Sequence, residues 1–75
     1  MRELVEVLCK ALVDEPDLVD VREKEDERTV VIEVRVAPSD MGKVIGKQGR
    51  IAKAIRTLVK SAAARSSKRV TVEFI

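Results

Sequence analysis

Residues 41–50 read MGKVIGKQGR and hold all three glycines of the chain together with three cations. Glycine adopts backbone angles that other residues avoid, and it lets an extended ligand come close to the main chain. Within this stretch GKQG, residues 46–49, is expected to join two helices, with Gly49 at the start of the second one. The first N–H groups of a helix and its dipole favour a bound anion, and Lys47 and Arg50 add full positive charge beside them. The stretch therefore predicts a binding site for phosphate groups.

Two more lysines, Lys43 and Lys53, extend this positive charge by one helical turn in each direction. A ligand with several phosphates in a row would therefore meet a continuous track of cations rather than a single point. The stretch is not a nucleotide-binding P-loop, because only three residues separate Gly42 from Gly46 and no hydroxyl follows Lys47. A nucleic-acid backbone is the ligand that fits this pattern.

The sequence before this stretch predicts a helix followed by a β-hairpin. The helix has apolar residues at helical spacing, namely Leu4, Val5, Leu8, Cys9 and Leu12. It is expected to stop at residues 14–16, DEP, because proline disfavours helix in the residue before it. From Leu18 onward valines alternate with charged residues, and the run EKEDER at 23–28 predicts a solvated turn. The second strand then keeps period two at Val30, Ile32, Val34 and Val36.

The sequence after the hairpin predicts two helices and a last strand. Pro38 is expected to end the second strand, and Ser39 is expected to cap a short helix. This helix would run from Asp40 to Ile45 and end at Gly46. The next helix is amphipathic, with an apolar stripe of Ile51, Ala54, Ile55, Leu58, Val59 and Ala62, and with Arg50, Lys53, Arg56 and Lys60 on the opposite side. Val70, Val72 and Phe74 alternate with polar residues in the last strand, so the order is α-β-β-α-α-β in an α+β fold.

Length and composition limit the classes of protein that fit this chain. With 75 residues we expect one small domain, and 45% apolar with 37% charged residues suits an ordinary globular protein. Apolar runs are far shorter than the roughly 20 residues that span a bilayer, and the N-terminus does not resemble a signal peptide, so a cytoplasmic protein is expected. The single cysteine, Cys9, has no histidine as a partner, and we expect it to be a small buried hydrophobe.

The net charge of +2 hides an uneven distribution along the chain. Residues 1–40 hold 6 Lys and Arg against 12 Asp and Glu, whereas residues 41–75 hold 9 against 1. Such asymmetry suggests a polyanionic partner that approaches the basic half while the acidic half repels it. Solubility patterning explains the charge alone equally well.

Residues 44–49, VIGKQG, resemble the V-I-G-x-x-G signature of KH domains, and the α-β-β-α-α-β order resembles their type II arrangement. The resemblance covers essentially the whole chain, so residues 1–75 are expected to form a single KH domain. In length and in residues 40–56, DMGKVIGKQGRIAKAIR, the chain most resembles the small single-domain bacterial KH proteins of the KhpA family. This resemblance implies a three-stranded sheet packed on one side by three helices. One departure is Ala52, where many KH motifs have isoleucine, so base preference is not carried over.

KH domains hold about four nucleotides of single-stranded nucleic acid and clamp the backbone at the GXXG loop. By resemblance, the GKQG residues take the clamp role, and an apolar edge formed by Val44 and Ile45 faces bases across the groove. Farther along the helix, Arg56 and Lys60 are expected to form a solvated face rather than direct contacts. The expected RNA-binding residues are Lys43, Val44, Ile45, Gly46, Lys47, Gln48, Gly49, Arg50 and Lys53.

Some of these residues also have a purely structural interpretation. Ile51 and Ile55 are expected mainly in the core, because apolar residues at helical spacing are more often core than ligand floor. For Val44 and Ile45 the core and the rim of the groove are equally open, and Gly42 fits a helix-packing role.

The resemblance implies a non-enzymatic binder of single-stranded RNA, of the RNA chaperone or post-transcriptional regulator type, without a cofactor. The residues alone leave single-stranded DNA open. Phe74 is the only aromatic residue, which argues against modules that stack bases on aromatic platforms. A second hypothesis is a protein-interaction module, for dimerisation or scaffolding, that has the same fold and does not bind RNA. An enzyme is not expected, because the chain has neither histidine nor tyrosine and Cys9 has no activating partner.

The small number of nucleotides that one clamp can hold suggests that two RNA-binding domains act together. One clamp reads about four nucleotides, which is too few for tight selective binding, and joining two clamps makes the second contact intramolecular. We therefore expect a homodimer, or a heterodimer with another RNA-binding protein. No sequence feature marks the interface.

Overall fold

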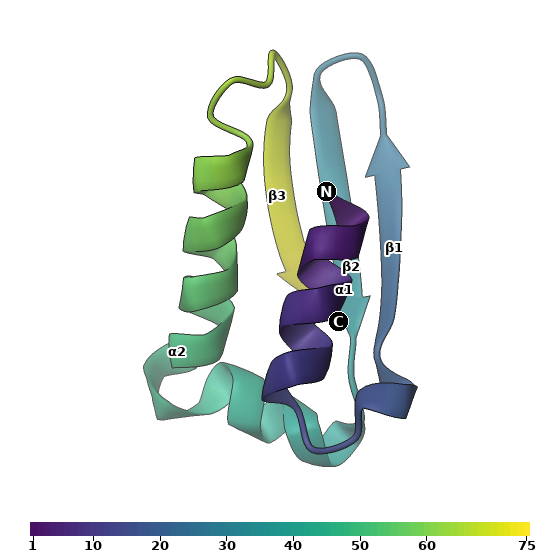
Figure 1. Ribbon diagram of the computed structural model, residues 1–75, viewed down its shortest axis with the longest axis vertical. Helices are drawn as coiled ribbons and strands as arrows, with labels where there is room; N and C mark the ends of the chain where they lie inside the picture. Colours follow the sequence, from purple (N-terminus) through teal and green to yellow (C-terminus); the bar gives the residue numbers. More distant parts are fainter.

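The structure, a computed structural model, describes residues 1–46 and 49–75. Its elements are α1 (Arg2–Leu12), the 3-10 helix η1 (Pro16–Leu18), β1 (Asp20–Glu25), β2 (Thr29–Arg35), α2 (Pro38–Ala62) and β3 (Arg69–Phe74). The strands form one layer, and α1 and α2 lie against the same face of it (Figure 1). The predicted α+β fold, a three-stranded sheet with helices on one side, is confirmed.

The sheet has the order β1-β2-β3 and mixed strand directions. β1 and β2 pair antiparallel as the predicted hairpin, with Val21 opposite Val34. β2 and β3 pair in parallel, with Ile32 opposite Val72. Two parallel neighbours need a long crossover connection, and α2 supplies it. This topology places α2 along β3, at one edge of the sheet.

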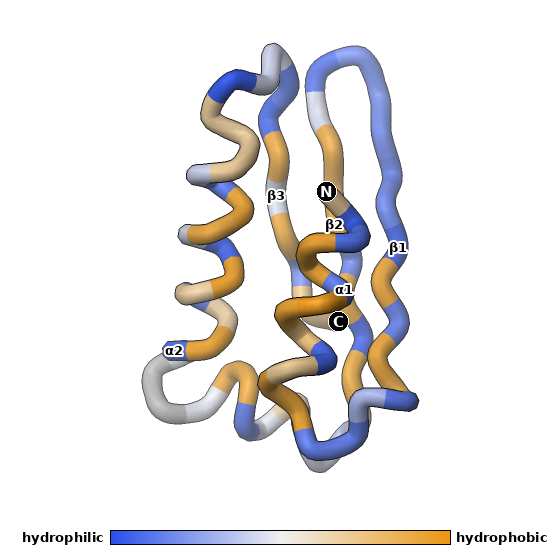
Figure 2. The backbone as a smooth tube through the Cα atoms, viewed as in Figure 1, coloured by the Kyte–Doolittle hydropathy of each residue, from blue (hydrophilic) through white to orange (hydrophobic). Residues whose placement is uncertain are grey.

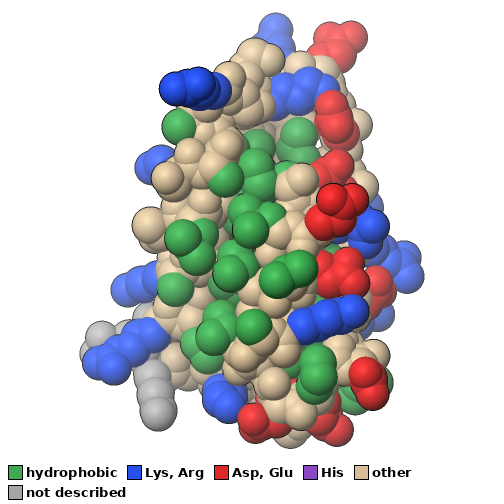
Figure 3. Space-filling view, viewed as in Figure 1, with side chains coloured by type: hydrophobic (Ala, Val, Ile, Leu, Met, Phe, Trp, Pro, Cys, Tyr) green, Lys and Arg blue, Asp and Glu red, His purple; other side chains and the backbone are tan. Residues whose placement is uncertain are grey.

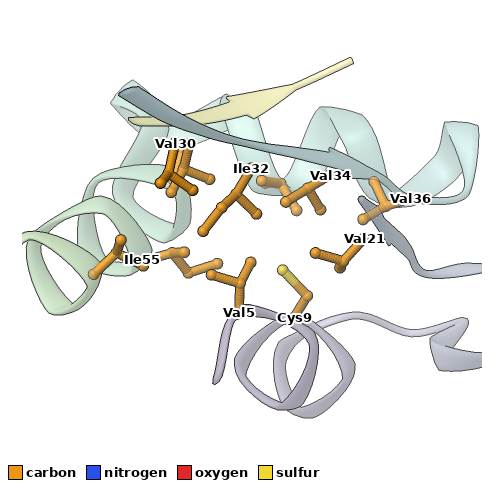
Figure 4. Packing of buried hydrophobic residues seen from close by; sticks show 12 residues of the cluster. Val5, Cys9, Val21, Val30, Ile32, Val34, Val36 and Ile55 are labelled. Atoms are coloured by element: carbon orange, nitrogen blue, oxygen red, sulfur yellow. The ribbon is translucent and has the colours of Figure 1, made fainter. Parts of the chain in front are cut away.

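The core lies between the sheet and the two helices (Figure 4). Alternate side chains of β2 point to the helices, because successive residues of a strand face opposite sides. From the strand side, Val30, Ile32, Val34 and Val36 are buried; from the helices, Val5, Cys9, Ile55 and Val59 are buried. The period-two prediction for β2 and the prediction of Cys9 as a buried hydrophobe are confirmed.

The turn between β1 and β2 is shorter than predicted. Residues 23–25 of the EKEDER run are exposed, but they belong to β1, where Glu25 pairs with Val30. The turn occupies residues 26–28, and the Asp26 carboxylate accepts the N–H groups of Arg28 at 2.8 Å and Thr29 at 2.7 Å. These hydrogen bonds lower the pKa of Asp26, because they favour the charged carboxylate. Backbone pairing with β2 therefore overrides the turn propensity of the charged residues.

Helix α2 begins earlier than predicted, and Ser39 is not its N-cap. The cap is Ala37, and Pro38 is the first helical residue, where its fixed φ and missing N–H fit without penalty. The Ser39 hydroxyl instead donates a hydrogen bond to the Glu15 carboxylate at 2.9 Å.

The two helices predicted around GKQG are a single element with a change of direction. Figure 1 shows α2 as two limbs, which we call the first limb (residues 38–46) and the second limb (residues 49–62). Gly49 has a φ of 67°, opposite in sign to the helical value of about −63°. Glycine reaches this angle without steric penalty, which explains how the chain turns at this point.

Within residues 1–46 and 49–75, no helix is both long enough and apolar enough to cross a bilayer.

Candidate nucleic-acid interface

The second limb of α2 presents three different faces along its length. Successive helical residues turn by about 100°, so residues three or four apart share a face. The face against the sheet is buried and consists of Ala52, Ile55 and Val59. One flank, toward β3, carries Lys53, Arg56 and Lys60, and the opposite flank carries Ile51, Ala54, Leu58 and Ala62. We call these the cationic flank and the apolar flank; Figure 2 shows the resulting alternation of hydrophobic and hydrophilic residues along this limb.

Gly42 and Gly46 leave a strip of bare backbone on the first limb. They are four residues apart and therefore share a helix face. A Cβ at either position would meet no described atom within 4 Å, and only Gly49 has a positive φ. Glycine inside a helix costs roughly 0.5–1 kcal/mol relative to alanine. Among the described residues nothing requires glycine at these two positions, which corrects the helix-packing interpretation of Gly42.

A hollow of about 610 Å³ opens at this strip. Gly42 and Gly46 line it together with Lys43, Arg50 and Ile51, so both limbs of α2 border it. We call it the glycine hollow. Its described wall combines bare backbone with the cationic side chains of Lys43 and Arg50, which is the combination that an approaching phosphate backbone needs.

The structure separates the two residues predicted to form an apolar edge. Val44 is 1% exposed and belongs to the core, so the expectation that its side chain faces bases is wrong. Ile45 is 52% exposed and is the member of the pair that a ligand can reach. The reason is helical geometry, because neighbouring residues of a helix point in directions about 100° apart.

The predicted cations differ in their surroundings. Lys43 is exposed, and its ammonium group forms an ion pair with the Asp14 carboxylate at 3.1 Å. Arg50 and Lys53 are exposed on the second limb. Lys47 and Gln48 lie outside the described residues, so their clamp role and the anion-binding N–H groups expected there stay predictions.

A second hollow, of about 500 Å³, lies between the second limb and β3. Its cationic side chains are Arg56 and Lys60 from the helix and Lys68 and Arg69 from the chain entering β3. We call it the strand hollow. The prediction treated Arg56 and Lys60 only as a solvated face and did not single out Lys68 or Arg69. Helical periodicity puts Arg56 and Lys60 on one flank, but only the parallel pairing of β3 brings the other two beside them.

Arg56 is held in place at the wall of the strand hollow. Its Nε donates a hydrogen bond to the Val72 carbonyl at 3.2 Å, and its guanidinium lies 5.5 Å from the centre of the Phe74 ring. A cation over an aromatic face is attracted by the ring quadrupole. These contacts link the cationic flank to the edge strand β3.

The fold, the bend at Gly49 and the two cationic hollows are compatible with a KH domain, and the comparison with known families decides the matter. A model of the KhpA/KhpB KH domain matches residues 2–74. The chain belongs to the KhpA/KhpB KH-domain family. The match includes every described helix and strand and the whole GKQG stretch.

Several curated relatives of this KhpA/KhpB-family chain carry the name "RNA-binding protein KhpA". The relative from Caldanaerobacter subterraneus subsp. tengcongensis is 63% identical over 75 residues, which covers 100% of both chains. The relative from Clostridium perfringens is 59% identical over the same full coverage. The relative from Aquifex aeolicus is 51% identical over 100% of this chain and 95% of its own. These names agree with the expectation of a chain that is not an enzyme. No solved structure is significantly similar to the chain.

The surface charge of the KhpA/KhpB-family chain is divided in space as it is in sequence. Figure 3 shows mainly cations on the side of α2, most of the visible acidic residues together with some cations on the side of β1, and hydrophobic residues between them. The cationic side contains both hollows, while the acidic side would repel a polyanion. Among the described residues, no group of three or more His, Cys, Asp or Glu side chains is placed to hold a metal ion.

Proposed function

We propose that this chain is a non-enzymatic binder of single-stranded RNA that holds the RNA backbone at the GKQG loop and the glycine hollow. The observation that carries the proposal is the strip formed by Gly42 and Gly46. These glycines weaken the helix, and no described neighbour needs the space that they leave. A ligand backbone that approaches the main chain does need that space. Lys43 and Arg50 stand beside the strip and supply charge for phosphates.

The cationic flank gives the strand a path away from the clamp. It connects the glycine hollow to the strand hollow along the second limb, whose 14 residues span about 20 Å. A KH domain holds about four nucleotides, and a strand that leaves the clamp can follow this limb. Lys53, Arg56 and Lys60 would accompany the phosphates along it.

RNA is chosen over DNA because the curated relatives carry the name RNA-binding protein. A role as an RNA chaperone or post-transcriptional regulator, in the cytoplasm, is part of the proposal and rests on the family.

The test is direct binding by fluorescence anisotropy. We expect the protein to bind a labelled single-stranded RNA of about 12 nucleotides, and to bind the matching duplex far more weakly because its bases and backbone cannot enter the clamp. Lack of binding to the single strand at low salt would reject the proposal. The alternative of an interaction module without RNA binding would then take its place.

One observation favours an assembly in addition to RNA binding. Exposed apolar side chains lie on α1 and on the apolar flank of α2, and we call them the apolar face; it consists of Leu4, Val7, Leu12 and Leu58. Val7 is 65% exposed and Leu58 is 50% exposed. Exposed apolar side chains gathered on one surface often mark an interaction site.

We propose a second copy of this chain as the occupant of the apolar face. α1 holds two cations and two acidic residues, and Glu6 bridges Arg2 at 3.3 Å and Lys10 at 3.0 Å, so a second copy meets little net charge there. The apolar flank and the cationic flank lie on opposite sides of the second limb. Pairing through the apolar face would therefore leave both RNA sites open and join two short clamps into one longer reader. Another RNA-binding protein could occupy the apolar face instead and form a heterodimer. The light-scattering and pull-down measurements described below distinguish the two assemblies.

A further inference from the structure

A buried carboxylate connects the first limb of α2 to the turn after α1. Asp40 is 1% exposed, which is rare for an aspartate unless its oxygens are bonded. Its Oδ1 accepts the N–H of Asp14 and its Oδ2 accepts the N–H of Glu15, both at 3.0 Å. Both carboxylate oxygens are therefore used to hold the backbone of a segment about 25 residues away in the chain.

This connection places a negative side chain beside a cation of the glycine hollow. With its backbone held by Asp40, Asp14 lies beside the first limb, and its carboxylate accepts a hydrogen bond from the Lys43 ammonium at 3.1 Å. Among the described residues, Lys43 and Arg50 are the cations that line the glycine hollow. On the same turn, Glu15 accepts the hydroxyl of Ser39, which fixes the turn at a third point.

We propose that Asp14 is an affinity-determining residue outside the clamp, which competes with an RNA phosphate for Lys43. This inference rests on the proposed function and concerns the regulation of the same site. In the unbound protein the Asp14 carboxylate occupies the partner position of Lys43. When RNA binds, a phosphate exchanges with this carboxylate, so the contact replaces one ion pair by another. Asp40 acts as a positioning residue, because it fixes the backbone from which Asp14 reaches.

The exchange has two consequences for binding. The affinity for RNA is lower than the cations alone would give, because an ion pair is broken and a carboxylate stays near the phosphate. The contact at Lys43 also releases fewer counterions than a contact with an unpaired lysine would. It therefore adds less than about 0.7 to the slope of log affinity against log salt. Exposed pairs are usually weak because both side chains lose freedom, and here the fixed backbone of Asp14 reduces that loss.

The experiment is a double-mutant cycle on the intact chain with a labelled single-stranded RNA of about 12 nucleotides. Asp14→Asn keeps the backbone N–H that Asp40 accepts and removes the charge. We expect it to tighten binding about 3- to 10-fold at low salt and to steepen the slope of log affinity against log salt by up to about 0.7. In the Lys43→Gln background, the same change should alter the affinity less than about 2-fold.

The control for net charge is Glu27→Gln, which makes the same charge change in the β1–β2 turn, at the end of the molecule far from the first limb (Figure 1). We expect it to change the affinity less than about 2-fold. Equal effects of Asp14→Asn and Glu27→Gln, or an undiminished effect in the Lys43→Gln background, would overturn the competition. A parent protein that binds no RNA would instead reject the proposed function, so the two failures are distinguishable. Thermal melting of each variant identifies any loss of folding.

Discussion

At the scale of single residues, glycines are the most informative part of this chain. Gly49 is explained by its backbone angle, whereas Gly42 and Gly46 have negative φ and open space where a side chain would lie. Gly49 allows the bend in α2, whereas Gly42 and Gly46 are not needed for any described contact. Substitution separates these two roles.

Gly42→Ala is expected to stabilise the fold and weaken RNA binding. Alanine gains roughly 0.5–1 kcal/mol of helix stability, which raises the Tm of a domain of this size by a few degrees, while its methyl group fills the strip that the ligand approaches. Gly49→Ala is the contrasting variant and should lose about 1 kcal/mol because of the left-handed angle. Calorimetry and anisotropy measure both effects. Parental RNA affinity in Gly42→Ala would show that the strip is not a contact.

Lys47→Asp combined with Gln48→Asp tests the GKQG clamp. Both glycines stay, so the permitted backbone angles are unchanged, and acidic residues near a helix start interact favourably with its dipole. The free energy of unfolding should change within about 0.5 kcal/mol. Single-stranded RNA should bind at least about 100-fold more weakly, because two attractive contacts are lost and repulsion is added. A variant that melts and binds like the parent would disprove the clamp assignment.

Cys9 gives a prediction about pH. Burial raises the pKa of its thiol to about 11 from the ordinary value of 9.0, because the thiolate is poorly solvated in the core. Between about pH 9 and 11 the unfolded chain loses this proton and the folded chain keeps it, so stability falls with rising pH, by at most about 2–3 kcal/mol. Urea unfolding should show this fall in the parent and not in Cys9→Ala. A thiol reagent should label Cys9 at pH 8 only after unfolding, and rapid labelling of the folded chain would contradict the burial argument.

At the scale of elements, α2 is central to the proposed function because its second limb carries different residue types on its different sides. One face fills the core, one flank carries cations toward β3, and the opposite flank is apolar and exposed. Under the proposed function, RNA binding and self-association would use different sides of one helix. A change on one flank should leave the other function intact.

Leu58→Glu should make the protein monomeric. A charge in the middle of the apolar face cannot be buried against a second copy without a large desolvation penalty. Multi-angle light scattering should show a dimer for the parent and a monomer for the variant, while the affinity for a four-nucleotide RNA stays within about 2-fold. The matched control is Leu18→Glu, in η1, where the leucine is exposed outside the apolar face. A monomeric parent at high concentration would count against the homodimer, and recovery of another RNA-binding protein in pull-downs would assign the face to a heterodimer.

At the scale of the whole molecule, the fold collects the charge of the second half of the sequence on one side. Residues 41–75 carry 9 cations against 1 acidic residue, and among the described residues the cations lining the two hollows are Lys43, Arg50, Arg56, Lys60, Lys68 and Arg69. The hairpin puts much of the acidic half on the opposite side (Figure 3). A strand of RNA is thus attracted from one direction.

The salt dependence of binding follows from this arrangement. If three or four phosphates are neutralised, log affinity should fall with log salt at about −0.7 per phosphate, which gives a slope of about −2 to −3. Anisotropy titrations between about 50 and 300 mM salt measure the slope. A flat dependence would reject the track of cations, even if RNA binds.

The sequence by itself determined the features that depend on local spacing. Glycine and lysine types identified the GKQG stretch, the alternation of valines identified β2, and helical spacing identified α1 and the amphipathic second limb. These predictions hold because the period of a helix or strand decides which residues share a face. The family resemblance, drawn from the same residues, is confirmed by the match over residues 2–74.

Only the tertiary structure decided what each face meets. Spacing alone left Val44 open between core and rim, and the packed sheet placed it in the core. Residue spacing also did not predict three contacts. Asp40 holds the turn after α1, Asp14 pairs with Lys43, and β3 brings Lys68 and Arg69 to Arg56. These contacts join residues far apart in the chain. The first two depend on how the turn after α1 meets the first limb of α2, and the third depends on the parallel pairing of β2 with β3, so no local pattern in the sequence encodes them.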